Sequence, residues 1–149
     1  MRVAIGCDHA GFQLKQILIP YLRAQGHELR DFGTDSEVSV DYVDYVVPLT
    51  RAVARGEFER GIFCCGSGIG PAVAACKIPG GRAAVVSEEW SARDGVEHVD
   101  VNVLTLGQRV IGPEIAKSIV DAYLSAEPQG GRHQRRREKI AALEKERVG

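Results

Sequence analysis

The 149-residue sequence lacks several features that mark particular classes of protein. No apolar run is long enough to cross a bilayer, and the N-terminus becomes polar at Asp8 and His9, too early for a secretory signal. Charge of one sign is not in excess either, because 19 basic and 20 acidic side chains leave a net charge of −1. This balance argues against a general affinity for nucleic acid or anionic membranes. We therefore expect a cytoplasmic protein with neither a membrane nor a nucleic-acid partner.

Cysteine is also scarce, and the four thiols are Cys7, Cys64, Cys65 and Cys76. They fall in apparent strands and a helix of a chain that is 44% hydrophobic and long enough to form one sizeable core. Reduced thiols are therefore expected rather than disulfides. A Cys-x-x-Cys pair is missing, so zinc bound in that way is not expected. In a strand, adjacent Cys64 and Cys65 would point to opposite faces of the sheet.

Short β-branched runs alternate with helical patterns along the chain. Strands are expected at 3–7, 27–32, 61–64, 82–86 and 101–106, and helices at 11–25, 41–55 and 72–77, after Ser87 as a cap, from Pro113, and over 132–147. This alternation predicts an α/β fold, a three-layer Rossmann-like domain with a five-stranded parallel sheet in the order 2-1-3-4-5. One domain is expected over 1–149, in which 126–149 form a linker and a basic C-terminal helix that docks on a partner subunit.

The glycine-rich turn after the third strand is the strongest candidate site. An apolar run leads into Cys65-Gly66-Ser67-Gly68-Ile69-Gly70, and a helical stretch follows. The backbone N–H groups of such a turn, with the positive end of the helix, attract an anion. They also favour a thiolate, so the pKa of Cys65 is expected to fall. The alternative is that the turn simply reverses the chain, as it does in many α/β proteins.

Two familiar chemistries of glycine-rich loops do not fit this turn. A dinucleotide fingerprint, G-x-G-x-x-G, fails because the third glycine, Gly70, comes one residue early and Pro71 stands in its place. A cysteine-phosphatase loop requires an arginine six residues after the nucleophile, where this chain again has Pro71. Neither NAD binding nor phosphoryl transfer to Cys65 is therefore expected.

Other candidate residues follow the first strand and the fourth helical segment. Asp8 and His9 end the first strand, beside the third at the expected switch point, although Asp8 can also serve only as a helix cap. His98 lies between a helix and a strand, and in the company of Asp8, His9 and Cys65 it becomes a candidate acid–base group.

The segment after Gly130-Gly131 is strongly cationic. Arg132 and Arg136 stand four residues apart, so on a helix they share a face and can clamp one phosphate. A solvated basic helix and a contact with nucleic acid are the alternatives.

Several motifs together resemble one family. They are Asp8-His9-Ala10-Gly11, Asp41-Tyr42, the turn over 65–70, His98, Gly107-Gln108-Arg109-Val110-Ile111-Gly112 and Gly130-Gly131-Arg132-His133. In order and spacing, over almost the full length, the chain resembles the type B ribose-5-phosphate isomerase family, which includes the galactose-6-phosphate isomerase subunits.

The resemblance implies an aldose–ketose isomerase that interconverts ribose 5-phosphate and ribulose 5-phosphate through a cis-enediolate, with no metal or organic cofactor. It implies that Cys65 transfers the carbon-bound proton, that His98 helped by Asp8 opens the sugar ring, and that Ser67 hydrogen-bonds the reacting oxygen. The implied substrate contacts are His9, Arg109, Arg132, His133 and Arg136 to phosphate, Tyr42 and Val99 to the sugar, and the backbone of Gly66, Gly68, Ile69 and Gly70 to the enediolate. It further implies a homodimer or homotetramer whose active sites are shared between subunits.

Some positions depart from the common pattern of that family. Val99 and Cys76 replace asparagines, Val43 replaces a proline, Ser67 replaces a frequent threonine, and Pro71 stands where some relatives use a glutamate base. Lost polar contacts of this kind change specificity more than fold. The substrate can therefore be another phosphorylated sugar, a hexose 6-phosphate or a tetrose 4-phosphate, and a non-catalytic sugar-phosphate-binding relative is a further alternative.

Overall fold

The structure, a computed structural model, describes residues 1–147, so Val148 and Gly149 of the predicted domain lie outside the described residues. Its elements in chain order are β1 (Arg2–Cys7), a 3₁₀ turn η1 (His9–Gly11), α1 (Phe12–Ala24), β2 (Glu28–Asp31), α2 (Val43–Ala54), β3 (Arg60–Cys65), α3 (Ile69–Cys76), β4 (Ala83–Val85), α4 (Glu89–Val99), β5 (Val103–Gly107), α5 (Pro113–Ser125) and α6 (Arg132–Glu146). The strand–helix alternation predicted from the sequence is confirmed.

The five strands form one parallel sheet in the order β2-β1-β3-β5-β4. The predicted fold class is confirmed, and so is the placement of β1 beside β3. The predicted order 2-1-3-4-5 is wrong at one edge, where β5 lies next to β3 and β4 is outermost. Burial explains the exchange, because every residue of β5 is buried whereas the three-residue β4 is partly exposed. An inner strand of a parallel sheet must be apolar on both faces.

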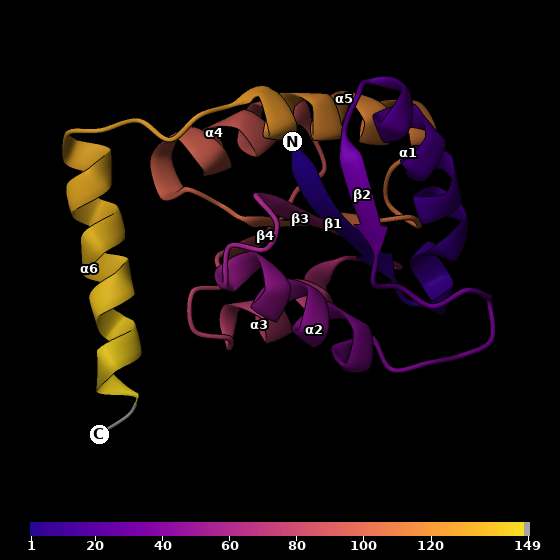
Figure 1. The fold of residues 1–149 in the computed structure, drawn as a ribbon, viewed down its shortest axis with the longest axis horizontal. Helices are drawn as coiled ribbons and strands as arrows, with labels where there is room; N and C mark the ends of the chain where they lie inside the picture. The colour runs from indigo at the N-terminus through magenta and orange to yellow at the C-terminus, as the bar shows by residue number, and fades with distance from the viewer. Residues whose placement is uncertain (148–149) are drawn as a thin grey trace.

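Helices cover both faces of the sheet and complete three layers (Figure 1). Helices α1, α4 and α5 lie on one face, and α2 and α3 lie on the other. Cys64 belongs to the core beneath the first group and Cys65 to the core beneath the second, so the prediction that they face opposite ways is confirmed. All four cysteines are free thiols, as expected.

Two predicted details around α4 are wrong. The cap is Glu88 rather than Ser87, since the Glu88 carboxylate accepts the N–H of Ser91 at 2.9 and 3.0 Å. His98 lies in the last turn of α4 and not in the following connection, because the helix continues to Val99. A carboxylate suits the positive N-terminus of a helix, which favours Glu88 as the cap.

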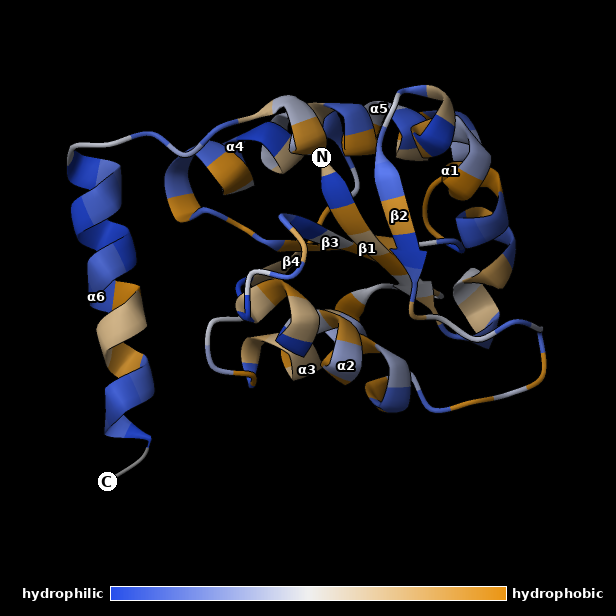
Figure 2. Cartoon of the chain, viewed as in Figure 1, coloured by the Kyte–Doolittle hydropathy of each residue, from blue (hydrophilic) through white to orange (hydrophobic). Residues whose placement is uncertain are grey.

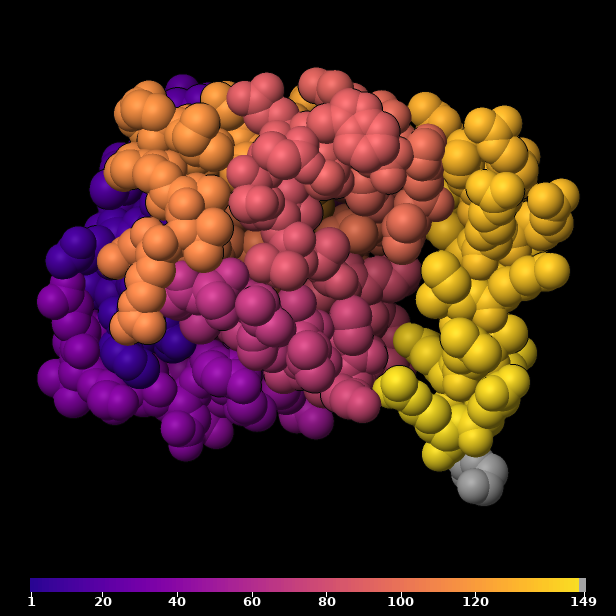
Figure 3. All heavy atoms as spheres, turned by 180° about the vertical axis from the view of Figure 1, so that it is seen from behind, coloured from indigo at the N-terminus to yellow at the C-terminus, as the bar shows by residue number. Residues whose placement is uncertain are grey.

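Helix α6 stands beside the three layers rather than within them (Figures 1 and 3). Arg137 joins its first half to α4 by donating to the carbonyl of His98 at 3.3 Å, and Glu144 accepts the N–H of Gly80 at 2.8 Å. Most of its surface is hydrophilic, with one apolar stretch around Ile140 and Leu143 (Figure 2). None of the helices formed by residues 1–147 has the length and apolarity needed to span a bilayer.

Candidate active site

The ends of β1 and β3 bring a carboxylate and a thiol together. Because Cys7 and Cys64 are paired in register, the residues that follow them, Asp8 and Cys65, lie side by side at the carboxyl ends of the two strands. The Cys65 thiol donates to Asp8 Oδ2 at 3.1 Å. The other oxygen, Oδ1, accepts the N–H groups of Ala10 at 3.0 Å and Gly11 at 3.1 Å. Asp8 is therefore both a cap and a partner of the thiol.

The glycine turn after β3 is held in one conformation by its neighbours. Gly68 has φ = 82°, a left-handed conformation that glycine adopts without strain. Its carbonyl accepts the hydroxyl of Thr105 in β5 at 2.7 Å. The hydroxyl of Ser67 accepts the N–H of Ile69 at 3.2 Å. Thr105 was not identified from the sequence, where it reads as an ordinary strand residue.

Burial, rather than the turn, dominates the acidity of Cys65. Its side chain is only 7% exposed, and this burial, with the hydrogen bond to Asp8, raises the pKa of the thiol above its ordinary value. The N–H groups of Gly66 and Gly68 reach the sulfur and lower the pKa, as the sequence suggested, but they do not outweigh burial. The predicted fall in the pKa of Cys65 is therefore wrong for the isolated chain.

Tyr42 and Arg109 border the same turn. A Cβ atom on Gly70 would lie 2.5 Å from the Tyr42 hydroxyl oxygen, and one on Gly66 would lie 3.2 Å from a guanidinium nitrogen of Arg109. The N–H of Arg109 also donates to the carbonyl of Gly66 at 3.0 Å. Glycines at 66 and 70 thus let a phenol and a guanidinium approach the turn.

His9 turns one ring nitrogen toward the connection between β2 and α2. Its Nδ1 accepts the N–H of Val40 at 3.1 Å, so in the neutral ring the hydrogen is on Nε2, which can donate to an anion. The base of this connection is anchored by Lys15, whose Nζ lies 2.7 Å from the carbonyl of Thr34 and 2.8 Å from Asp31. We call Asp8, His9, Tyr42, Cys65 and Arg109 the thiol cluster.

The other candidate residues lie near the amino ends of the strands, opposite the thiol cluster. Helix α4 returns from the carboxyl end of β4 to the amino end of β5, so His98 lies near the amino ends of the strands. The ion pair between Arg82, before β4, and Asp100, at 3.0 Å, fixes this end. Since the five residue steps of β3 span about 16 Å, the structure does not bring His98 to Cys65 within one chain.

His98 is accompanied there by the first turns of α6. Its ring stacks on that of His133, with centroids 3.8 Å apart and planes inclined by 4°. Burial lowers the pKa of His133, and the charges of His98, Arg132 and Arg136 lower it further. Arg132 and Arg136 are exposed. We call His98, Arg132, His133 and Arg136 the His–Arg cluster.

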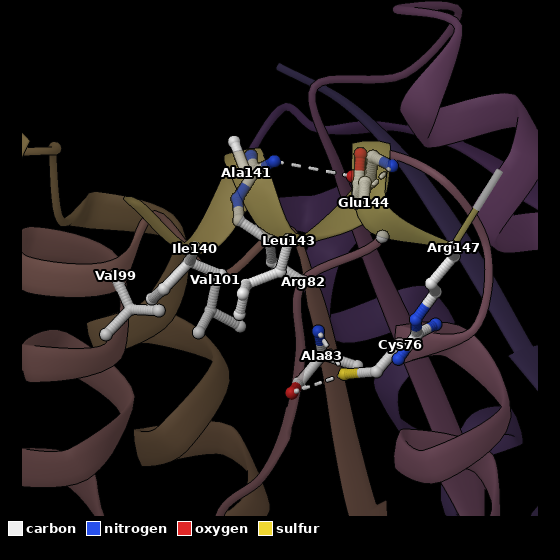
Figure 4. A pocket seen from close by; sticks show the side chains of 12 residues that line it. Cys76, Arg82, Ala83, Val99, Val101, Ile140, Ala141, Leu143, Glu144 and Arg147 are labelled. Carbon is white, nitrogen blue, oxygen red and sulfur yellow. Dashed lines mark hydrogen bonds between the residues drawn. The ribbon is translucent and has the colours of Figure 1, made fainter. Parts of the chain in front are cut away.

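Val99 does not lie with the thiol cluster either. It lines a pocket of about 260 Å³ between α6 and the layered body, together with Val101, Ile140 and Leu143 (Figure 4). Cys76 lines the same pocket and is hydrogen-bonded to the carbonyl of Ala83 at 3.4 Å. Two of the departures from the family pattern, Val99 and Cys76, thus fall in one place.

Within residues 1–147, no three His, Cys, Asp or Glu side chains gather closely enough to hold a metal ion. Two groups of polar side chains lie close together instead. A thiol lies beside a carboxylate at the carboxyl ends of the strands, and imidazoles lie beside arginines near the amino ends. A thiol can transfer a proton, and guanidinium groups bind phosphate oxygens.

Comparison with known proteins confirms the resemblance. A family described as Ribose/Galactose Isomerase matches residues 3–140. The chain is 48% identical over 146 residues to ribose-5-phosphate isomerase B of Escherichia coli, covering 98% of each protein. It is 38% identical over 145 residues to D-erythrulose-4-phosphate isomerase of Pectobacterium atrosepticum, covering 97% of this chain and 95% of that one. The solved structure of Clostridium thermocellum ribose-5-phosphate isomerase B superimposes with a TM-score of 0.96 at 47% identity, over 98% of this chain and 99% of that one.

Proposed function

This chain is an isomerase of the ribose/galactose isomerase family, and from that premise we propose that it interconverts ribose 5-phosphate and ribulose 5-phosphate. The observation that carries the proposal is the contact of 3.1 Å between Cys65 and Asp8 beside the glycine turn. Similarity to the Escherichia coli and Clostridium thermocellum enzymes over 98% of the chain favours this substrate among phosphorylated sugars.

The thiol cluster supplies the carbon-bound proton transfer. The thiolate of Cys65 removes the proton from C2 of the open-chain sugar. The electrons of that C–H bond form the C1=C2 bond of the enediolate, while the π electrons of the C1 carbonyl move to O1. The thiol then returns the proton to C1, while the O2 proton passes to O1 as the C2 carbonyl forms. Asp8, which accepts the thiol hydrogen bond, is placed to take up the proton when the thiolate forms.

The glycine turn serves the charge that develops on the sugar. Preorganised N–H groups of Gly66, Gly68, Ile69 and Gly70 stabilise the enediolate oxygen, a contribution that in enzymes is worth several kcal/mol. Ser67, exposed at the same turn, hydrogen-bonds the reacting oxygen. Tyr42 borders the sugar.

The His–Arg cluster supplies ring opening and most of the phosphate contacts. His98 Nε2 takes the proton of the anomeric hydroxyl and delivers it to the ring oxygen as the bond between C1 and that oxygen breaks. Arg132, His133 and Arg136 bind the phosphate together with His9 and Arg109 from the thiol cluster. Guanidinium forks match phosphate oxygens in charge and geometry.

Because the two clusters lie at opposite ends of the strands, we infer that the active site is shared between two copies of the chain. In a two-fold dimer, each thiol cluster would meet the His–Arg cluster of the other subunit. Exposed apolar side chains near the glycine turn and on α3 and β4 support such an interface, namely Ile69, Val73 and Val85. A homodimer is the smallest assembly that completes the site, and a homotetramer can contain two such dimers.

A second substrate is favoured by a specific feature. Val99, next to His98, presents an apolar side chain to the pocket beside α6, and it replaces a residue that donates hydrogen bonds in many relatives. A shorter sugar needs fewer polar contacts, and one relative at 38% identity is a D-erythrulose-4-phosphate isomerase. A tetrose 4-phosphate is therefore the alternative substrate. Free thiols at all four cysteines suit a reducing compartment, so we place the enzyme in the cytoplasm.

Formation of ribulose 5-phosphate from ribose 5-phosphate by the purified protein tests the proposal. We expect Cys65→Ala to lower kcat by at least about 100-fold, the usual contribution of a positioned acid–base group. The matched control is Cys76→Ala, which removes an exposed thiol from the end of α3 and should leave kcat unchanged. Erythrulose 4-phosphate and galactose 6-phosphate are assayed beside it. Full activity in Cys65→Ala would refute the role of the thiol, and faster turnover of erythrulose 4-phosphate would overturn the choice of substrate.

A further inference from the structure

Asp94, a carboxylate on α4, contacts the ring of His98. Asp94 lies one helical turn before His98, and its Oδ1 is 2.7 Å from His98 Nδ1. Because a carboxylate only accepts hydrogen bonds, this contact requires the hydrogen to be on Nδ1. In the neutral ring the free electron pair is then on Nε2, the nitrogen that faces away from Asp94.

The other contacts of His98 come from α6, whereas Glu97 and Asp100, its acidic neighbours in the chain, form no ion pair with it among residues 1–147. His133 stacks on one face of the His98 ring, and burial with the neighbouring positive charges lowers the pKa of His133. Arg137 donates to the carbonyl of His98 at 3.3 Å. Arg132 and Arg136 add positive charge from the same turns of α6. In residues 1–147, Asp94 is the one carboxylate that forms an ion pair with His98.

This arrangement has a consequence for proton transfer. Arg132, Arg136 and Arg137 place positive charge near the ring, and an imidazole that accepts the proton of a sugar hydroxyl becomes positive as well. A carboxylate at Nδ1 compensates this charge and also fixes the tautomer and the plane of the ring, the two effects that the aspartate has in a Ser-His-Asp triad. Stacking on His133 fixes the plane as well, but it cannot select the tautomer.

We propose that Asp94 is a positioning residue for the isomerase reaction, which holds His98 in the Nδ1–H tautomer so that Nε2 takes the proton of the sugar hydroxyl. The inference rests on the proposed function, because it is His98 that Asp94 serves. Asp94 contacts the ring of His98, so it acts on the reaction through His98 and not on the sugar directly.

The test compares Asp94→Ala with Glu97→Ala, which removes a carboxylate from the same helix next to His98 but forms no ion pair with it. We expect Asp94→Ala to lower kcat by about tenfold or more, with KM changed much less, because the orientation of an acid–base group is lost. Asp94→Glu, which keeps a carboxylate one turn away, should recover most of the activity.

A second readout does not depend on turnover. In ¹⁵N–¹H spectra of the histidine rings, His98 should show the Nδ1–H tautomer in the unchanged protein and in Glu97→Ala, and the Nε2–H tautomer in Asp94→Ala. An unchanged tautomer together with unchanged kcat in Asp94→Ala would overturn the inference while leaving the proposed function intact. If the unchanged protein isomerises no sugar phosphate, the proposed function fails, and the spectra still decide whether Asp94 holds the ring.

Discussion

At the scale of single residues, Cys65 is subject to opposing influences. Backbone N–H groups from the glycine turn stabilise the thiolate, whereas burial and the hydrogen bond to Asp8 stabilise the thiol. Burial and Asp8 prevail, so the resting side chain is a thiol at neutral pH. This preference suits a residue that must hold a proton between taking it from C2 and returning it to C1, since the proton has to stay out of water during that interval.

The raised pKa of Cys65 predicts a pH dependence with a definite sign. The thiolate fraction, and with it the rate of alkylation by iodoacetamide, should rise with pH and reach its midpoint above the ordinary pKa of a thiol, 9.0. Burial is the main cause of the raised pKa and the Asp8 carboxylate adds to it, so in Asp8→Asn the midpoint should move to lower pH. Mass spectrometry of the peptide carrying Cys65, in a Cys76→Ser background, gives the rate.

The control for this experiment is Asp35→Asn, which removes an exposed carboxylate from the connection before α2. Its midpoint should match that of the parent. A midpoint below 9.0 in the parent would show that burial does not dominate the pKa of the Cys65 thiol.

At the scale of helices and strands, the sequence predicted most of the fold and part of the site. Alternation of apolar runs with helical periodicity was enough for the parallel sheet, and glycine spacing was enough for the turn after β3. Strand order could not be predicted because it depends on which strand is buried on both faces. The contact between Asp94 and His98 was missed because His98 was assigned to a connection, so a spacing of four residues carried no meaning. Thr105 donates to the carbonyl of Gly68, and the N–H of Val40 donates to the ring of His9. Such contacts join residues that are remote in the sequence, so they leave no local pattern.

The connection from β2 to α2 is anchored by the buried ammonium group of Lys15, and we expect its removal to destabilise the protein. Lys15 Nζ, on a side chain that is 2% exposed, holds Asp31 and the carbonyl of Thr34 at the base of the connection. Lys15→Met leaves that carbonyl with only the weak thiol donor of Cys7, and we expect a loss of about 1–3 kcal/mol in the free energy of unfolding. We also expect a higher KM, because the same connection supplies Val40 to His9 and leads into Tyr42.

Urea unfolding at one fixed protein concentration measures the loss from Lys15→Met, since the stability of an oligomer depends on concentration. Lys77→Met is the control, because this substitution removes the same charge from an exposed lysine at the end of α3. Equal stability and equal KM in the two variants would show that the buried pair does not position the connection.

At the scale of the whole molecule, the topology itself separates the two halves of the site. A helix that connects two parallel strands returns the chain to their amino ends, so the end of α4 lies away from the turn that follows β3. The C-terminal helix α6 packs on the end of α4 and therefore carries its arginines to the same edge as His98. Under the proposed mechanism, a two-fold pair of copies would bring each thiol cluster to the His–Arg cluster of the other copy and complete both sites.

Mixed dimers distinguish a shared site from one built within a single chain. A dimer with Cys65→Ala in one chain and His98→Ala in the other, isolated with two different affinity tags, keeps one complete site if clusters from different chains meet. We expect roughly half of the kcat per dimer of the unchanged protein, although each parent homodimer is inactive. The reciprocal control places both substitutions in one chain beside an unchanged partner. That dimer should be inactive, because each of its two sites then lacks either the thiol or the imidazole. The opposite pattern, with activity only in the control, would mean that one chain completes the site by a rearrangement of α4 and α6.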